Sequence, residues 1–142
     1  MPKLNVLLLF SGGVHSVAAA RELLAAGHEV VGLHFAGLHQ SEIGRARLEA
    51  AQLGINLLTD GSVPSVDDTW DRDELIIRNL QWLGPVYRLC ASGRFQAIAT
   101  GVTAADLADP RLAPWIGKML DLANAFAALV GCELFHPLRS KP

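Results

Sequence analysis

The stretch LLLFSGGVHSVAAA, residues 7–20, joins an apolar run to a helical pattern through two adjacent glycines. The preceding run LNVLLLF, residues 4–10, is continuously apolar, which is typical of a strand buried on both faces of a parallel sheet. Residues 14–26 are rich in Ala and Leu at helical spacing, and Gly27 supplies a C-terminal stop. A buried strand that leads directly into a helix indicates an α/β protein.

The rest of the chain repeats this alternation of strand and helix. Further strands are predicted at 28–35, 55–60, 96–101 and 132–137. Helices are predicted at 41–54, with Ser41 as N-cap, at 71–93, with a break at Gly84-Pro85, and from Pro114 to residue 131. Loops are expected at 61–70 and between residue 103 and Pro114. The pattern predicts a single domain over 1–142, a five-stranded parallel sheet with helices on both faces.

In such a sheet, ligands bind at the carboxyl ends of the strands, near the point where the strand order reverses. The loops after the first, second and fourth strands are therefore the expected place for chemistry.

Composition excludes several classes of protein. The 142 residues are 51% hydrophobic and 18% charged, with a net charge of −2, so there is no basic footprint for duplex nucleic acid. No apolar run reaches the roughly 18 residues of a membrane span, and the first residues fit a buried strand better than a signal peptide. Cys90 and Cys132 are the only cysteines. They are expected to be reduced, buried thiols in a cytoplasmic protein.

The turn after the first strand has the properties of a phosphate cradle. Gly12 and Gly13 allow the backbone to approach a ligand closely, and the helix that follows presents free N–H groups to an anion. Ser11 and Ser16 add hydroxyl donors on either side. The alternative is a tight turn that binds nothing, but Ser-Gly-Gly-x-x-Ser between a buried strand and a helix favours phosphate.

FSGGVHS, residues 10–16, resembles the Ser-Gly-Gly-x-Asp-Ser signature of the PP-loop ATP pyrophosphatases. Members of this superfamily use ATP to adenylate a carboxylate or carbonyl oxygen, release pyrophosphate, and let a nitrogen or sulfur nucleophile displace AMP. Residues 78–101, 97–123 and HPLRSK at 136–141 resemble, more loosely, elements of the 7-cyano-7-deazaguanine synthases of queuosine biosynthesis. The resemblance implies a Rossmann-like HUP fold, ATP as cofactor and a ligase-type reaction.

The resemblance also implies roles for individual residues. Those expected to bind the nucleotide are Ser11, Gly12, Gly13, Val14 and Ser16 at the phosphates, Leu33, His34 and Phe35 at the adenine, Gly101 beneath the nucleotide, and Arg111 near the substrate. Those expected to take part in catalysis are Ser11, His15, Ser16, Asp106 near the substrate, and Lys141 at the phosphates.

Three departures from the family pattern bear on chemistry. His15 stands where the family has the Asp that helps to hold Mg²⁺, and imidazole is a poor ligand for that ion. Val102-Thr103 replaces the usual Asn region after the fourth strand. No four-cysteine zinc module follows RSKP, so the full deazaguanine reaction is not expected. Mg²⁺ is therefore a weaker expectation than ATP.

Other polar and aromatic residues have ordinary and functional interpretations. His34 and His39 form a weak candidate metal pair, and His28 and His136 are interpreted as structural. The acidic run 67–74 suits the start of a helix, with a Mg²⁺ role as the alternative. The three tryptophans are interpreted as core or interface anchors, and the apolar helix after Pro114 as a contact with a second copy or a partner chain.

Three functional hypotheses follow. The first is an adenylating enzyme that acts on a small-molecule or nucleobase-like substrate. The second is a module that binds ATP or AMP and works with a partner chain. The third is a structural domain that has lost the site.

Overall fold

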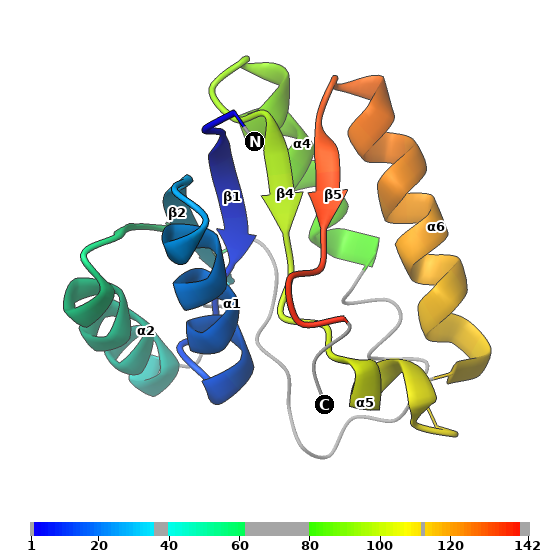
Figure 1. Cartoon of the computed structure of the whole chain (residues 1–142), viewed down its shortest axis with the longest axis horizontal. Helices are drawn as coiled ribbons and strands as arrows, with labels where there is room; N and C mark the ends of the chain where they lie inside the picture. Colours follow the sequence, from blue (N-terminus) through cyan, green and yellow to red (C-terminus); the bar gives the residue numbers. More distant parts are fainter. Residues whose placement is uncertain (1, 36–39, 62–79, 112, 140–142) are drawn as a thin grey trace.

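The computed structural model describes residues 2–35, 40–61, 80–111 and 113–139. Strands and helices alternate along the chain (Figure 1). The strands are β1 (Asn5–Leu9), β2 (Glu29–Phe35), β3 (Asn56–Asp60), β4 (Ala97–Ala99) and β5 (Glu133–Phe135). The helices are α1 (Val14–Ala25), α2 (Gln40–Leu53), α4 (Leu83–Ala91), α5 (Ala104–Ala108) and α6 (Ala113–Leu129).

The five strands form one sheet in the order β3-β2-β1-β4-β5, and every neighbouring pair is parallel. The chain runs outward from β1 to β2 and β3, then crosses to the other side of β1 for β4 and β5. The order therefore reverses between β1 and β4, the position at which such sheets bind ligands. The predicted fold class is confirmed: the protein has a Rossmann-like α/β fold.

Helices cover both faces of the sheet, with α1 and α2 on one face and α4 and α6 on the other (Figure 1). The run in β1 serves both layers, since Val6 and Leu8 pack in the cluster with α1 and α2, and Leu7 packs in the cluster with α4 and α6. All three side chains are fully buried. This explains why the first strand is continuously apolar.

The two layers are built from side chains of different size. The cluster on the α1 and α2 face contains six alanines: Ala19, Ala20, Ala46, Ala50, Ala97 and Ala99. Small side chains let helix backbones approach the sheet closely. The cluster on the α4 and α6 face contains Leu33, Phe35, Trp82 and Phe95 among its buried members, so that layer is filled by bulkier groups.

Several element boundaries differ from the sequence prediction. The strands predicted at 96–101 and 132–137 are each three residues long. Just beyond them the Thr100 N–H still donates to the Phe135 carbonyl at 3.0 Å, and the Thr100 and His136 side chains are hydrogen-bonded to each other. Helix α2 begins at Gln40, so the prediction of Ser41 as N-cap is wrong. The helix predicted at 71–93 is interrupted, but at Trp82 and not at Gly84-Pro85, because Gly84 and Pro85 lie in the first turn of α4, where proline is tolerated.

The segment predicted as a loop after residue 103 contains the short helix α5, so that prediction is wrong. Thr103 and Asp106 form a reciprocal capping box: the Thr103 hydroxyl accepts from the Asp106 N–H at 3.1 Å, and the Asp106 carboxylate accepts from the Thr103 N–H at 2.9 Å. Two orphan amides are satisfied at once, which is enough to start a turn of helix there. The loop predicted at 61–70 and the helical segment 71–79 lie outside the described residues, apart from Gly61.

Cys90 and Cys132 are buried free thiols, as predicted. Burial, with the neighbouring Cys132, raises the pKa of the Cys90 thiol to about 12. Across the described parts of the chain, the structure has no helix of the length and apolarity needed to cross a membrane. His28 is structural, since its Nδ1 accepts a hydrogen bond from the Leu4 N–H at 3.2 Å.

Candidate functional site

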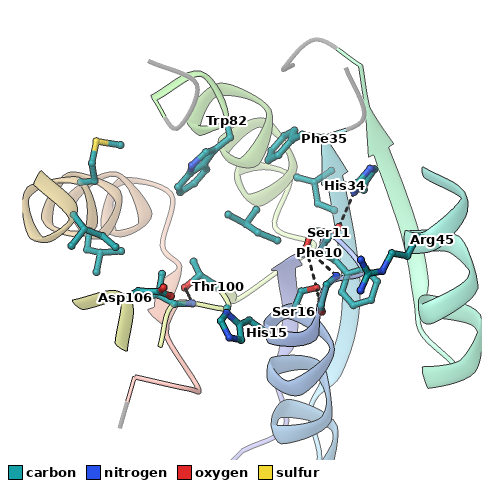
Figure 2. Close-up of a pocket in the computed structure, with 18 of the residues that line it drawn as sticks. Phe10, Ser11, His15, Ser16, His34, Phe35, Arg45, Trp82, Thr100 and Asp106 are labelled. Carbon is teal, nitrogen blue, oxygen red and sulfur yellow. Dashed lines mark hydrogen bonds between the residues drawn. The ribbon is translucent and has the colours of Figure 1, made fainter. Parts of the chain in front are cut away.

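A cavity of about 530 Å³ opens at the carboxyl ends of β1, β2 and β4 (Figure 2). This is the edge of the sheet at which the sequence predicts chemistry. The cavity has a polar end, at the turn between β1 and α1, and an apolar end formed mainly by α6 and by Trp82, which directly precedes α4. Its walls come from Leu9, Phe10, Ser11, Gly13, His15, Ser16, Leu33, His34, Phe35, Arg45, Trp82, Thr100, Gly101, Val102, Asp106, Trp115, Ile116, Met119 and Leu120.

The polar end is held in shape by two serine hydroxyls. Ser16 Oγ accepts from the Gly12 N–H at 3.1 Å and donates to the Gly13 carbonyl at 3.0 Å. Ser11 Oγ accepts from the Gly13 N–H at 3.1 Å and lies 3.3 Å from Ser16 Oγ. We refer to residues 11–16 as the anion loop. The hydrogen bonds of the two serines hold the backbone of this loop in one conformation.

The anion loop leads into the N-terminus of α1, a helix of 12 residues. Gly13 is the N-cap residue, no side chain caps the helix, and its first turn contains no acidic residue. The first amides of the helix therefore keep the partial positive charge of a free helix N-terminus, which attracts anions.

Two glycines bring other elements against the anion loop. Gly12 has φ of +80°, and a Cβ on it would lie 2.9 Å from Ala46 Cα in α2. A Cβ on Gly101, just after β4, would lie 3.2 Å from the carbonyl carbon of His15. The loop is thus held between α2 and the end of β4 by backbone contacts that allow no side chain at either glycine.

His34 and Trp115 leave polar atoms unsatisfied at the cavity. His34 Nδ1 lies 3.0 Å from the Phe10 carbonyl, and since a carbonyl only accepts, this nitrogen is the donor. In the neutral ring, Nε2 then carries a lone pair; it is buried and has no hydrogen-bond partner among the described residues, and the same holds for the Trp115 indole N–H. Unsatisfied buried polar atoms are uncommon, and two that line one cavity point to a ligand.

Thr100 and Asp106 are polar groups on the side of the cavity away from α2 (Figure 2). Thr100 Oγ1 lies 2.6 Å from His136 Nδ1 and accepts from the Val102 N–H at 3.3 Å. Burial and the nearby Arg139 lower the pKa of His136, so the ring stays neutral beside this hydroxyl. Asp106 Oδ2 is engaged in the capping box, which orients the carboxylate.

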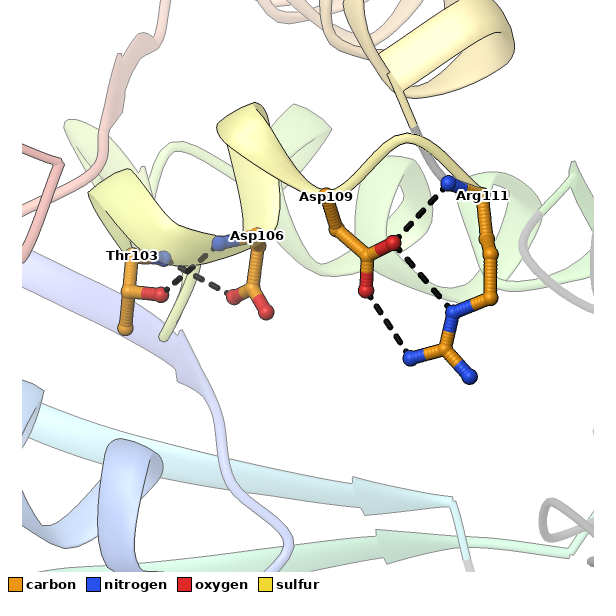
Figure 3. A network of polar contacts seen from close by, with 4 residues as sticks. All are labelled: Thr103, Asp106, Asp109 and Arg111. Atoms are coloured by element: carbon orange, nitrogen blue, oxygen red, sulfur yellow. Dashed lines mark hydrogen bonds and ion pairs between the residues drawn. The ribbon is translucent and has the colours of Figure 1, made fainter.

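The structure brings most of the predicted residues to this cavity: Ser11, Gly13, His15, Ser16, Leu33, His34, Phe35, Gly101 and Asp106. Gly12 and Val14 instead border a small hollow on the other side of the loop. The Arg111 side chain is 88% exposed and forms an ion pair with Asp109 at 3.0 Å (Figure 3). That pair raises the pKa of Arg111 and lowers the pKa of Asp109.

Lys141, His39 and the acidic run 67–74 lie outside the described residues. Within the described parts of the chain, no group of three His, Cys, Asp or Glu side chains is placed to hold a metal ion. The apolar helix α6 has two exposed leucines, Leu122 and Leu129. A contact with a second chain through this helix stays a prediction.

Arg45 and the apolar end of the cavity were missed by reasoning from sequence. Arg45 lies in the middle of α2, and only the contact of α2 with Gly12 places it beside the anion loop. Trp82 and Trp115 were interpreted as core or interface anchors, but both line the cavity. The Thr103-x-x-Asp106 spacing was a readable signal for the capping box.

The fold and the edge cavity define a Rossmann-like α/β protein with a candidate anion site. No protein-family model matches the chain, and no curated protein matches it either. Solved structures do resemble it. One is described as a predicted subunit of tRNA methyltransferase from Methanocaldococcus jannaschii, with a TM-score of 0.61, 18% identity, and alignment over 98% of this chain and 70% of that one.

Two further structures are more distant. A glycotransferase of kitacinnamycin has a TM-score of 0.58 and 14% identity, and the match covers 96% of this chain and 30% of that one. PH1313 from Pyrococcus horikoshii has a TM-score of 0.52 and 14% identity, covering 97% of this chain and 38% of that one. The chain thus spans well under half of either protein. At these identities, the similarity shows the fold alone.

Proposed function

We propose that the protein binds ATP through the anion loop and adenylates a small-molecule or nucleobase-like substrate, with release of pyrophosphate. One observation carries this proposal. The Ser-Gly-Gly-x-x-Ser loop, whose sequence resembles that of the PP-loop ATP pyrophosphatases, lies at the free N-terminus of α1 and forms the polar end of the cavity at the strand-order reversal.

The reaction assigns a task to each end of the cavity. A carboxylate or carbonyl oxygen of the substrate attacks the α-phosphorus of ATP, and the bond to the bridging oxygen breaks. Pyrophosphate leaves with that electron pair. Ser11 and the first amides of α1 donate to the negative charge that develops on the leaving group, and Ser16 holds the loop in shape through its hydrogen bonds with Gly12 and Gly13. The apolar end has room for a flat ring, with Trp82 and Trp115 among its walls.

Nucleotide binding is tested by calorimetry of the folded chain with ATP, ADP and AMP. Gly13→Asp places a carboxylate in the anion loop and is expected to abolish binding by charge repulsion. Gly117→Asp, on an exposed glycine of α6 with open space around it, adds the same charge elsewhere and should leave affinity unchanged. If no nucleotide binds to the folded wild-type protein, the proposed function is wrong.

His15 favours a second candidate function, a module that binds ATP or AMP without turnover. It replaces the acidic residue of the resembling family and lies exposed at the cavity, where it makes no hydrogen bond with another described residue. Pyrophosphate release should be measured with a panel of carboxylic acids for the wild type and for His15→Asp. Nucleotide binding without release by either protein would support the module over the enzyme.

A further inference from the structure

We infer that Arg45 supplies the positive charge at the anion loop, and that the site binds a diphosphate or triphosphate without a divalent cation. This inference rests on the proposed function, since it concerns how the same loop holds phosphate. Arg45 lies in α2, outside the Ser-Gly-Gly-x-x-Ser sequence of the loop.

The described residues fit magnesium poorly. Mg²⁺ is usually held by one or two carboxylates together with the phosphates of the ligand. The anion loop, Ser11 to Ser16, contains no carboxylate. Among the described residues that line the cavity, Asp106 is the only acid, and one of its oxygens is occupied by the Thr103 N–H. The loop therefore needs another source of positive charge to balance a polyphosphate.

Helix α2 holds Arg45 close to the loop. The backbone at Arg45 and Ala46 lies against Gly12, where a built Cβ would be 3.3 Å from the Arg45 carbonyl carbon and 2.9 Å from Ala46 Cα. Ala46 is fully buried, so no larger side chain separates the helix from the loop. The contact between the backbones of α2 and the loop thus sets the position of Arg45 relative to the loop.

The Arg45 side chain is directed toward the anion loop, near Ser11 and Phe10 (Figure 2). It borders both the main cavity and the small hollow on the other side of the loop. No hydrogen bond or ion pair of Arg45 is found within the described parts of the chain. Arg21 and Glu49 border the same small hollow. Their opposite charges balance each other, so the positive charge of Arg45 is not cancelled.

A guanidinium at this position suits a phosphate chain. Arginine stays charged over the whole physiological range and presents paired N–H donors that match two phosphate oxygens. Three donor groups then converge on one anion: the Ser11 hydroxyl, the amides at the start of α1, and the Arg45 guanidinium. The buried His34 Nε2, which has no hydrogen-bond partner in the described part of the chain, is an independent sign that the cavity takes a ligand.

The experiment is calorimetry of the full chain with inorganic pyrophosphate and with ATP, each in EDTA and in excess MgCl₂. Wild-type affinity in EDTA is expected to stay within about threefold of that in MgCl₂. Arg45→Gln should weaken binding of both ligands about 10- to 100-fold, the loss expected for a charge-assisted hydrogen bond. Arg45→Lys should retain part of the affinity, because lysine keeps the positive charge but lacks the paired N–H donors of the guanidinium.

Arg47→Gln is the matched control, since Arg47 is exposed on the same helix and does not line the cavity. Its affinity should equal that of the wild type. The inference is overturned if Arg45→Gln binds as tightly as Arg47→Gln, or if EDTA abolishes wild-type binding while MgCl₂ restores it. In either case nucleotide binding survives, and the proposed function with it. Absence of binding to the wild type in both buffers overturns both.

Discussion

Replacing Gly12 by alanine tests how closely α2 is seated against the anion loop. Two separate costs are expected. The φ of +80° is a left-handed conformation that costs an L-residue about 1–2 kcal/mol. The added Cβ would also lie 2.9 Å from Ala46 Cα and 3.0 Å from its nitrogen, and these backbone atoms cannot rotate away. Overpacking of this kind typically costs about 1–3 kcal/mol.

The two costs can be separated with a second glycine. Gly27 has φ of +90°, and a Cβ on it would meet nothing within 4 Å, so Gly27→Ala carries the conformational cost alone. We expect Gly12→Ala to lower the free energy of unfolding by about 2–5 kcal/mol and Gly27→Ala by about 1–2 kcal/mol. The difference between the variants isolates the contact with α2.

Urea denaturation followed by circular dichroism measures both values. A domain stability of about 5–15 kcal/mol exceeds the expected loss over most of that range, so the unfolding curve of the Gly12 variant can be fitted. If the two variants differ by less than about 0.5 kcal/mol, α2 is not seated on the loop as described. Arg45 would then not be held beside the loop by the contact between α2 and Gly12.

Three further predictions concern other parts of the chain. Lowering the pH through about 6.5 should reduce stability, because burial and Arg139 hold the pKa of His136 below its ordinary 6.5 and the unfolded chain takes up the proton first; urea titrations should show a shallower pH slope in His136→Gln. Iodoacetamide should leave Cys90 unmodified in the native protein and label it in urea, since its pKa is raised to about 12; rapid native labelling in a mass spectrum would contradict this. Thr103→Ala should lower the free energy of unfolding by about 0.5–2 kcal/mol, and Thr103→Ser by little; equal melts for the two would show that the cap contributes nothing.

The architecture was predictable because its signals are local. The apolar run of β1, the glycines at 12 and 13, and the helical spacing of α1 each depend on neighbours in sequence. Strand ends were less predictable, because the contacts around them join residues far apart in the chain, such as the side-chain hydrogen bond between Thr100 and His136, 36 residues apart. That contact exists only once the strands are paired.

The anion loop could be predicted from its sequence, but the rest of the cavity could not. Arg45 lies in an ordinary amphipathic helix, and nothing near it in sequence marks it as different from Arg47. Trp82 and Trp115 come from segments far apart in the chain and reach the cavity through the packing of α4 and α6. Their roles follow from topology, which a residue pattern does not encode.

The difference in side-chain size between the two layers has a consequence for how this site can change. The polar end of the cavity belongs to the alanine-packed layer, where a methyl group added at Gly12 has no space. The apolar end belongs to the layer of α4 and α6, where Ile116, Met119 and Leu120 are only half buried. Substitutions that reshape the apolar end should therefore be tolerated, while the polar end stays constant. A protein built in this way can acquire new substrates while it continues to bind the phosphate group that they share.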